Sequence, residues 1–171
     1  MIRIGLFAGL VLALPAFAAA QTPASGGACN DVEHHRLDFW VGRWTVTKTG
    51  EDRVVADSLI EPVYGCGIRE NWMPKNHQDG GSLSIYVPAA KEWRQTWIDS
   101  SGEYTDYRGG WTGRAMVLLA DSATAAGKPM QMRMTYSRGD AGTVRQTGFN
   151  STDGGKTWTP DYDFTYHPVA R

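Results

Sequence analysis

The chain of 171 residues and 18.8 kDa has the length of one ordinary domain, which argues against a repeat array or a multidomain enzyme. Hydrophobic residues make up 42% of it and charged residues 20%, and its seven tryptophans indicate a packed core and exclude a disordered chain. The net charge of -1 offers no long-range attraction for nucleic acid or for an anionic membrane, so we expect neither as a partner.

Residues 1–20 have the three parts of a signal peptide. A basic residue stands near the start, an uncharged apolar run covers 4–14, and small residues precede possible cleavage sites after Ala18 and Ala20. A transmembrane anchor is the alternative, but the apolar run is shorter than the ~20 residues that cross a bilayer. We therefore expect cleavage near Ala18 or Ala20, export to the periplasm or the medium, and no membrane span in the mature chain.

Two cysteines, Cys29 and Cys66, remain in the mature chain, and an even count in an exported protein favours pairing. We expect a disulfide that ties an N-terminal arm, residues 21–38, to the first hairpin and stabilises the fold by about 3 to 4 kcal/mol. A metal site is the poorer interpretation, because neither cysteine has a cysteine nearby and only His34 and His35 lie close. A lipid anchor on Cys29 is disfavoured because this residue lies well beyond the apolar run.

Residues 39–168 predict an all-β domain. Turn signals recur about every ten residues, and the segments between them, such as 83–87 and 93–98, alternate with period two. This pattern predicts a single antiparallel up-and-down barrel of about eight to ten strands, like a lipocalin or a fatty-acid-binding protein, with a two-sheet sandwich as the alternative. Only residues 31–38 and 121–128 could be helical, and the second segment has the composition of a loop.

Residues 151–158 fit the S-x-D-x-G-x-T-W pattern of an Asp box. In such a turn, Asp153 accepts hydrogen bonds from turn amides, Gly155 relieves the tight backbone and Trp158 packs beneath. Sialidases repeat the motif once per propeller blade, whereas this chain has one copy and is too short for a propeller. We therefore give the motif a structural role and infer no sugar hydrolysis from it.

A further set of motifs resembles a known family. Gly42 and Trp44 form a G-x-W like that at the start of the first strand of lipocalins and other calycin barrels, in which the tryptophan plugs the closed end. The longer D-F-W-x-G-x-W-x-V over 38–46, with segments 65–72 and 93–99 and the Asp box, resembles a bacterial family of exported lipocalin-like proteins, domain of unknown function fifteen-seventy-nine. The resemblance covers most of the chain and implies a calycin-type barrel without an established reaction.

Alternation along the strands sorts the side chains into an inner and an outer row. With Trp44 pointing inward, the inner rows are rich in aromatic residues and contain a few polar groups, and the last strand contributes Trp158 and Tyr166 to them. Such a wall suits a small hydrophobic or amphipathic molecule, with no cofactor or metal expected and with Glu70 orienting the polar end of the ligand. The candidate ligand-binding residues are Glu70, Trp72, Gln95, Trp97, Met132, Tyr162 and Phe164.

Two other functions stay open. A filled barrel would have a structural or interaction role in the cell envelope, with Glu70 and Gln95 satisfied by tyrosines. An open barrel could be an isomerase or lyase-type enzyme in which Glu70 is the general base and Asp99 or a tyrosine is the acid partner. An ion pair of Glu70 with Arg108 or Arg145 would prevent that chemistry, and we favour this ion pair over the catalytic role.

The histidines favour no haem or metal site. Some related ten-stranded barrels hold haem through a histidine of a late strand, but the parity of His167 places it on the face opposite to Tyr166. His34 and His35 belong to the arm, and His77 lies in a polar loop. We expect these last three in solvent.

Overall fold

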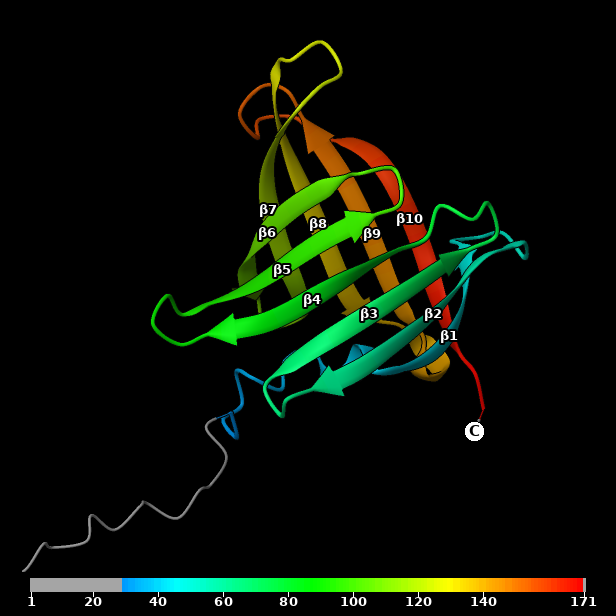
Figure 1. Cartoon of the computed structure of the whole chain (residues 1–171). Helices are drawn as coiled ribbons and strands as arrows, with labels where there is room; N and C mark the ends of the chain where they lie inside the picture. The colour runs from blue at the N-terminus through cyan, green and yellow to red at the C-terminus, as the bar shows by residue number, and fades with distance from the viewer. Residues whose placement is uncertain (1–28, 171) are drawn as a thin grey trace, which may run out of the picture.

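The computed structural model describes residues 29–170, so the expected signal peptide and the first part of the arm lie outside the described residues. Figure 1 shows strands wound around one axis, with the arm crossing one end of the barrel. The two short 3-10 helices are η1 (Asp38–Trp40) and η2 (Asp140–Gly142). The strands are β1 (Gly42–Lys48), β2 (Val54–Val63), β3 (Gly67–Pro74), β4 (Gly80–Val87), β5 (Glu92–Asp99), β6 (Tyr104–Trp111), β7 (Ala115–Ala123), β8 (Pro129–Arg138), β9 (Val144–Ser151) and β10 (Thr159–Pro168).

The sheet closes on itself. Each strand pairs antiparallel with its neighbours in the sequence, and β1 pairs with β10, where Val46 lies opposite Tyr166. Closure leaves no exposed sheet edge and gives all ten strands one common interior. The predicted up-and-down barrel is confirmed, with ten strands, and the two-sheet sandwich is excluded.

Period-two alternation holds along the strands. In β3, Ile68 and Glu70 are buried, whereas Arg69 and Asn71 are exposed. The segment 121–128 is not helical: its first residues continue β7, and the remainder forms the turn into β8.

Tryptophans close the end of the barrel crossed by the arm. Trp40 of η1 is fully buried, and its carbonyl oxygen accepts a hydrogen bond from Nε1 of Trp44 at 2.9 Å. The Trp40 ring packs inside against Tyr136 and Tyr166, with centroids 4.5 and 6.0 Å away. Gly42 packs against the Trp44 indole, at a distance where a Cβ would make ordinary van der Waals contact with the ring at 3.4 Å. Burial of these large rings makes this end a solid plug.

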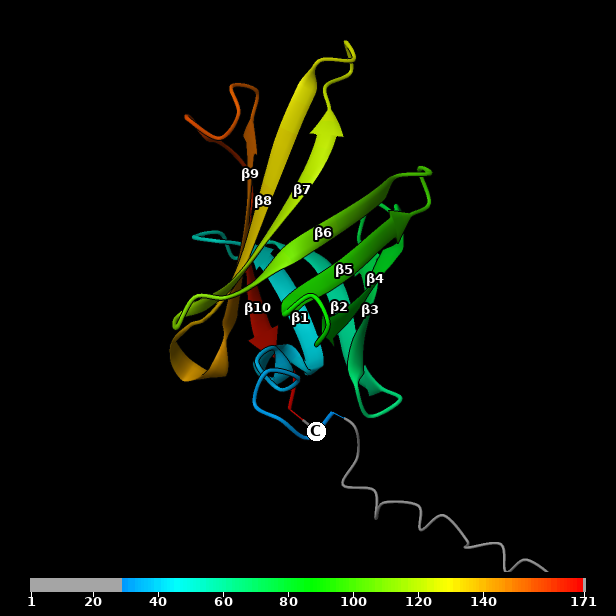
Figure 2. The same cartoon turned by 90° about the vertical axis from the view of Figure 1, so that its left-hand side faces the viewer.

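The disulfide between Cys29 and Cys66 is confirmed. Cys66 lies in the turn between β2 and β3, so the bond ties the arm to the second hairpin, and the prediction of the first hairpin is wrong. The reason is the up-and-down topology, which places successive turns at opposite ends of the barrel. The β1–β2 turn lies at the open end, whereas the β2–β3 turn returns to the end that the arm crosses (Figure 2).

The arm packs more closely than its sequence suggested. His34 is only 6% exposed, its Nδ1 lies 2.8 Å from Oδ2 of Asp31, and its ring meets Tyr86 edge-on at 5.2 Å. Nε1 of Trp93 donates a hydrogen bond to the carbonyl oxygen of Glu33 at 3.1 Å and fixes the arm across the barrel end. The expectation that His34 lies in solvent is therefore wrong, whereas His35 and His77 are exposed.

The Asp box forms the turn between β9 and β10. Oδ1 of Asp153 accepts hydrogen bonds from the backbone N–H groups of Lys156 and Thr157 at 3.0 and 2.9 Å, and Oδ2 accepts one from the Thr157 hydroxyl at 2.6 Å. These bonds, the Thr157 hydroxyl foremost, lower the pKa of Asp153 to about 2. Nε1 of Trp158 donates to the carbonyl oxygen of Gly155 at 3.0 Å, so the motif stabilises a hairpin.

Trp158 lies on the outer face of the barrel, and its predicted place in the inner row is wrong. A bulge between Pro160 and Tyr162 inserts a residue into β10 and reverses the alternation before it. The Trp158 ring packs at 4.3 Å from the guanidinium of Arg133, whose other neighbour is Phe149 at 5.0 Å.

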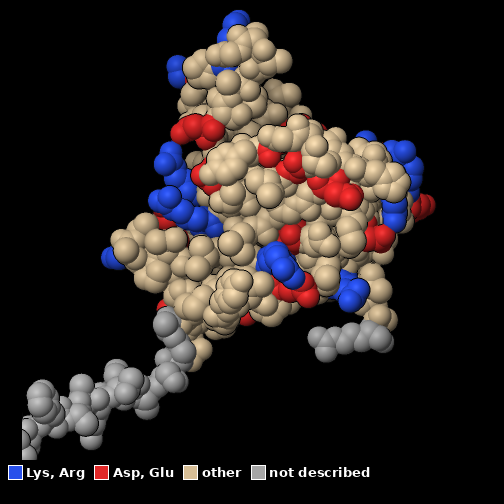
Figure 3. All heavy atoms as spheres, viewed as in Figure 1, with Lys and Arg blue, Asp and Glu red and all other residues tan. Residues whose placement is uncertain are grey.

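Charges of both signs are mixed on the outer surface, as Figure 3 shows for one face. Several of them form exposed cross-strand pairs, such as Arg69 with Glu61 at 2.7 Å and Arg108 with Asp121 at 3.1 Å. Exposed pairs of this kind contribute little to stability. In the part of the chain that the structure describes, no helix is long and apolar enough to cross a membrane.

Replacing both Cys29 and Cys66 with serine is expected to lower the free energy of unfolding by about 3 to 4 kcal/mol, because the unfolded chain regains the entropy of the closed loop. Urea unfolding of the double variant and the wild type measures the difference. A loss below about 1 kcal/mol would show that the arm is held by His34 and Trp93 without the covalent bond.

Candidate functional site

The end of the barrel opposite the plug is hollow. A cavity of about 630 Å³ opens between the turns that join β1 to β2, β3 to β4, β5 to β6 and β9 to β10. Small-molecule sites in proteins have volumes of about 300 to 1,000 Å³, so the cavity can hold a ligand of ordinary size. The cavity agrees with the prediction of a ligand-sized interior, and the barrel is not filled at this end.

The wall of this cavity is rich in aromatic side chains between the mouth and the plugged end. The rings of Tyr162 and Phe164 stack at 5.2 Å, and Trp72 packs against Phe164 at 5.6 Å. The side chains predicted to bind a ligand all line the cavity: Glu70, Trp72, Gln95, Trp97, Met132, Tyr162 and Phe164.

Two glycines let large rings lie flat against the wall. A Cβ on Gly80 would come within 2.6 Å of the Trp97 ring, and a Cβ on Gly148 would collide with the ring of Tyr162. Any larger residue at these inward positions would push an aromatic ring into the cavity. The open volume therefore depends on these two small residues as well as on the aromatic ones.

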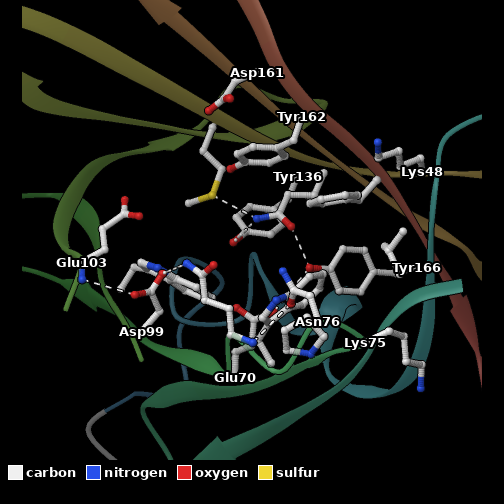
Figure 4. Close-up of a pocket in the computed structure, with 18 of the residues that line it drawn as sticks. Lys48, Glu70, Lys75, Asn76, Asp99, Glu103, Tyr136, Asp161, Tyr162 and Tyr166 are labelled. Atoms are coloured by element: carbon white, nitrogen blue, oxygen red, sulfur yellow. Dashed lines mark hydrogen bonds between the residues drawn. The ribbon is translucent and has the colours of Figure 1, made fainter. Parts of the chain in front are cut away.

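Glu70 lies at the floor of the cavity (Figure 4), and Tyr166, whose hydroxyl lies near it, also packs against Trp40 of the plug. The side chain is 5% exposed, and its two carboxyl oxygens accept hydrogen bonds from the hydroxyls of Ser58 on β2 and Ser82 on β4, both at 3.1 Å. The hydroxyl of Tyr166 on β10 lies 3.4 Å from Oε1. The two strands adjacent to β3 therefore hold the carboxyl group, and β10, which β2 and β1 separate from β3, places a third hydroxyl near it.

A chain of hydrogen bonds continues from Glu70 around the floor. The Tyr166 hydroxyl donates to Oε1 of Gln146 at 2.7 Å, and Nε2 of Gln146 donates to the Tyr136 hydroxyl at 3.1 Å. Tyr136 in turn donates to Oε1 of Gln95 at 3.2 Å. The prediction that tyrosines satisfy these buried polar groups is correct for Gln95, which accepts from Tyr136, whereas the nearest partners of Glu70 are Ser58 and Ser82. A connected network fixes each polar group of the floor in one orientation.

Burial raises the pKa of Glu70 from its ordinary 4.5 to about 7, because desolvation of the carboxylate outweighs the stabilising bonds from Ser82 and Ser58. No lysine, arginine or histidine of the described residues forms an ion pair with it. The favoured pairing of Glu70 with Arg108 or Arg145 is wrong. Both arginines point outward, where Arg108 pairs with Asp121 and Arg145 with Asp163.

Two phenols of the cavity have hydroxyls with spare donor capacity. The hydroxyl of Tyr162 makes no hydrogen bond to any described residue, and that of Tyr107 reaches only the sulfur of Met132 at 3.9 Å. Desolvation raises the pKa of both phenols, so they stay neutral and can donate to a ligand.

Charged side chains of both signs surround the mouth. Lys48, Arg53 and Lys75 belong to the hairpins β1–β2 and β3–β4. The acidic side chains of the mouth are Asp99, Glu103 and Asp161, and Figure 4 shows Asp99 and Glu103 on the side away from Lys48 and Lys75. Lys75 is paired with Asp57 on the outer surface.

Asp99 is not an acid partner for Glu70. It lies half-exposed at the mouth and accepts hydrogen bonds from Ser101 and from Nε2 of Gln78, at 2.6 and 3.2 Å. The bond from Ser101 is the main cause of its lowered pKa, which keeps it ionised. Alternation correctly predicted that Asp99 faces the cavity, but it could not show that Asp99 lies at the mouth and Glu70 at the floor.

Ser58 and Ser82 were not predicted as partners of Glu70. The sequence contained a feature that could have predicted these contacts. Each serine occupies an inward position between inward-facing residues of the same strand, as Ser58 does between Ala56 and Ile60. A buried hydroxyl on an apolar face needs a partner, and the register of β2, β3 and β4 supplies Glu70.

No group of three or more His, Cys, Asp and Glu side chains in residues 29–170 is arranged to hold a metal ion. His167 is exposed on the outer face, where Nε2 lies 3.1 Å from the Thr47 hydroxyl.

No protein-family model matches the chain, and no curated protein matches its sequence. The function must therefore be inferred from the shape and chemistry of the cavity, above all from its aromatic wall and from Glu70 at its floor.

The raised pKa of Glu70 predicts that stability falls with rising pH. Below pH 4.5 the carboxyl is protonated in both states; between 4.5 and about 7 the unfolded chain loses its proton first, which destabilises the fold by up to about 3 kcal/mol. Glu70→Gln should remove this loss, so that at pH 8 the variant is the more stable protein.

Urea unfolding at several pH values measures this effect, with Glu51→Gln, a change on the exposed β1–β2 turn, as the matched control. The control should keep the wild-type profile. Parallel profiles for the wild type and Glu70→Gln between pH 4 and 8 would contradict the prediction.

Proposed function

We propose that this chain is an exported barrel that binds a small hydrophobic or amphipathic molecule. The observation that carries the proposal is the cavity of about 630 Å³, which is open at one end and plugged at the other. Its aromatic wall suits an apolar body, and its floor of Glu70 and the tyrosine–glutamine chain suits a polar group at the inner end. Membership in the exported lipocalin-like family is part of the same proposal.

The disulfide bond supports export. The bond between Cys29 and Cys66 pairs both cysteines of the sequence, and such bonds persist in oxidising compartments. A signal peptide over residues 1–20 would deliver the chain to such a compartment, the periplasm or the medium.

A second candidate is acid–base catalysis by Glu70, favoured by its position in an open cavity without a cationic partner. A carboxyl group that titrates near neutrality can abstract and return a proton, and the neutral hydroxyl of Tyr162 could stabilise an oxyanion. Incubation of an enolisable ketone in D₂O tests this role. Catalysis predicts deuterium uptake that Glu70→Gln reduces by about 10²- to 10⁴-fold, and no uptake above the protein-free rate would exclude it for that substrate.

Ligand binding should quench the fluorescence of the cavity tryptophans, Trp72 and Trp97, because a ligand would contact their rings. We expect Trp72→Phe and Trp97→Phe each to reduce the ligand-induced quenching. Trp158→Phe, on the outer face, is the matched control and should leave it unchanged.

The measurement uses a panel of lipids and aromatic metabolites, with native mass spectrometry to count bound molecules independently of fluorescence. A panel in which nothing binds, or quenching lost in Trp158→Phe but retained in both cavity variants, would contradict binding in the barrel.

A further inference from the structure

Within the proposed binding function, we propose that the barrel selects an organic cation, in which an ammonium or amidinium group on an apolar body lies against Glu70. The cavity offers one deep acidic group and no deep basic group among the described residues. The ligand would enter with its positive end first and leave its apolar body between the rings of Trp72, Trp97 and Tyr162.

The charge balance at the floor favours a cation. Ser58 and Ser82 donate hydroxyl hydrogen bonds to Glu70, and the Tyr166 hydroxyl, which donates its one proton to Gln146, lies 3.4 Å away. None of these three groups carries a positive charge. A buried carboxylate without a cation is costly, and a ligand cation would supply the missing charge where the dielectric constant is low. Ligand binding would therefore stabilise the ionised form of Glu70.

The aromatic surface around this carboxyl has the same preference. Trp72 follows Glu70 on the inner row of β3, and its ring packs at 6.2 Å from that of Tyr166, the phenol nearest the carboxyl. Indole and phenol faces attract cations, most strongly when the cation is desolvated. The floor thus combines an anion with π-faces, and both favour a positive group over a neutral one.

The other charged groups near Glu70 do not reverse this preference. β2 and β4 present serines, whereas β6, β8 and β10 present phenols that burial keeps neutral: Tyr107, Tyr136, Tyr162 and Tyr166. The mouth carries three basic and three acidic side chains, all exposed except the half-exposed Asp99: Lys48, Arg53, Lys75, Asp99, Glu103 and Asp161. Their opposite charges balance and are screened by solvent. Glu70 therefore determines the sign of the field at the floor.

Binding of a cation is coupled to loss of a proton. In the ligand-free protein Glu70 is about half protonated at pH 7, and the cation takes the place of that proton as the O–H bond breaks and the proton passes to the buffer. A permanently charged ligand should therefore release about half a proton at pH 7. It should also bind about tenfold more tightly at pH 8 than at pH 6.

A matched set of probes separates charge from shape. The set is 4-phenylbutyltrimethylammonium, 4-phenylbutylamine, 4-phenyl-1-butanol and 5-phenylpentanoate, which share one phenylbutyl body and differ in the end group. Titration calorimetry in buffers of different ionisation enthalpy measures both the affinity and the proton release. The proteins are the wild type, Glu70→Gln and the surface control Glu51→Gln.

We expect both cations to bind at least about tenfold more tightly than the alcohol at pH 8, and the carboxylate to bind most weakly. Glu70→Gln should abolish this preference, the pH dependence and the proton release, and should keep the affinity for the alcohol. Glu51→Gln should behave as the wild type. Retained binding of the alcohol shows that a weakened cation affinity does not come from misfolding.

Two outcomes overturn the inference in distinguishable ways. If the alcohol or the carboxylate binds as tightly as the two cations, selection of a cation is wrong, while small-molecule binding by the barrel stands. If no probe binds and the wider panel of lipids and aromatic metabolites also fails, the proposed function is wrong and this inference falls with it.

Discussion

The pairing of β1 with β10 is the constraint on which the remaining structure depends. Because the sheet closes, every second side chain of the ten strands points into one common interior, and the side chains between them point outward toward solvent. Helix η1, which follows the arm, then fills one end of that interior with Trp40, and the other end stays open. The cavity exists because the ten strands enclose more space than the side chains of the plug and of the wall occupy.

Glu70 gives this cavity its chemical character. A small barrel can fill its floor with apolar side chains, yet here a carboxyl is held by Ser58 and Ser82 and joined through Tyr166 to a chain of neutral hydrogen-bonding groups. Such a network satisfies the polar atoms but adds no positive charge. The polar groups of the site are therefore held in place before a ligand binds. No positive charge among the described residues of the site balances the negative charge of the ionised Glu70 carboxylate.

The sequence predicted the fold and the cavity wall because both depend on local patterns. Alternation correctly placed Trp72 and Tyr162 inside, since it needs only the strand register. It failed for Trp158, because a bulge reversed the parity. The expected exposure of His34 rested on its place in the arm and was wrong, because the packing of an irregular arm has no periodic signal. The partner of Glu70 was also missed: an arginine such as Arg145 is equally available in the sequence, and only the three-dimensional structure directs it outward.

Glu70 is a buried carboxyl without a cationic partner among the described residues, and its own titration tests this most directly. Carbon-detected NMR of the carboxyl groups in the ligand-free protein, with Glu70→Gln to assign the resonance, measures its pKa. We expect a midpoint of about 7. A midpoint near the ordinary 4.5 would show that the carboxylate is solvated or paired with a cation, and would contradict this claim.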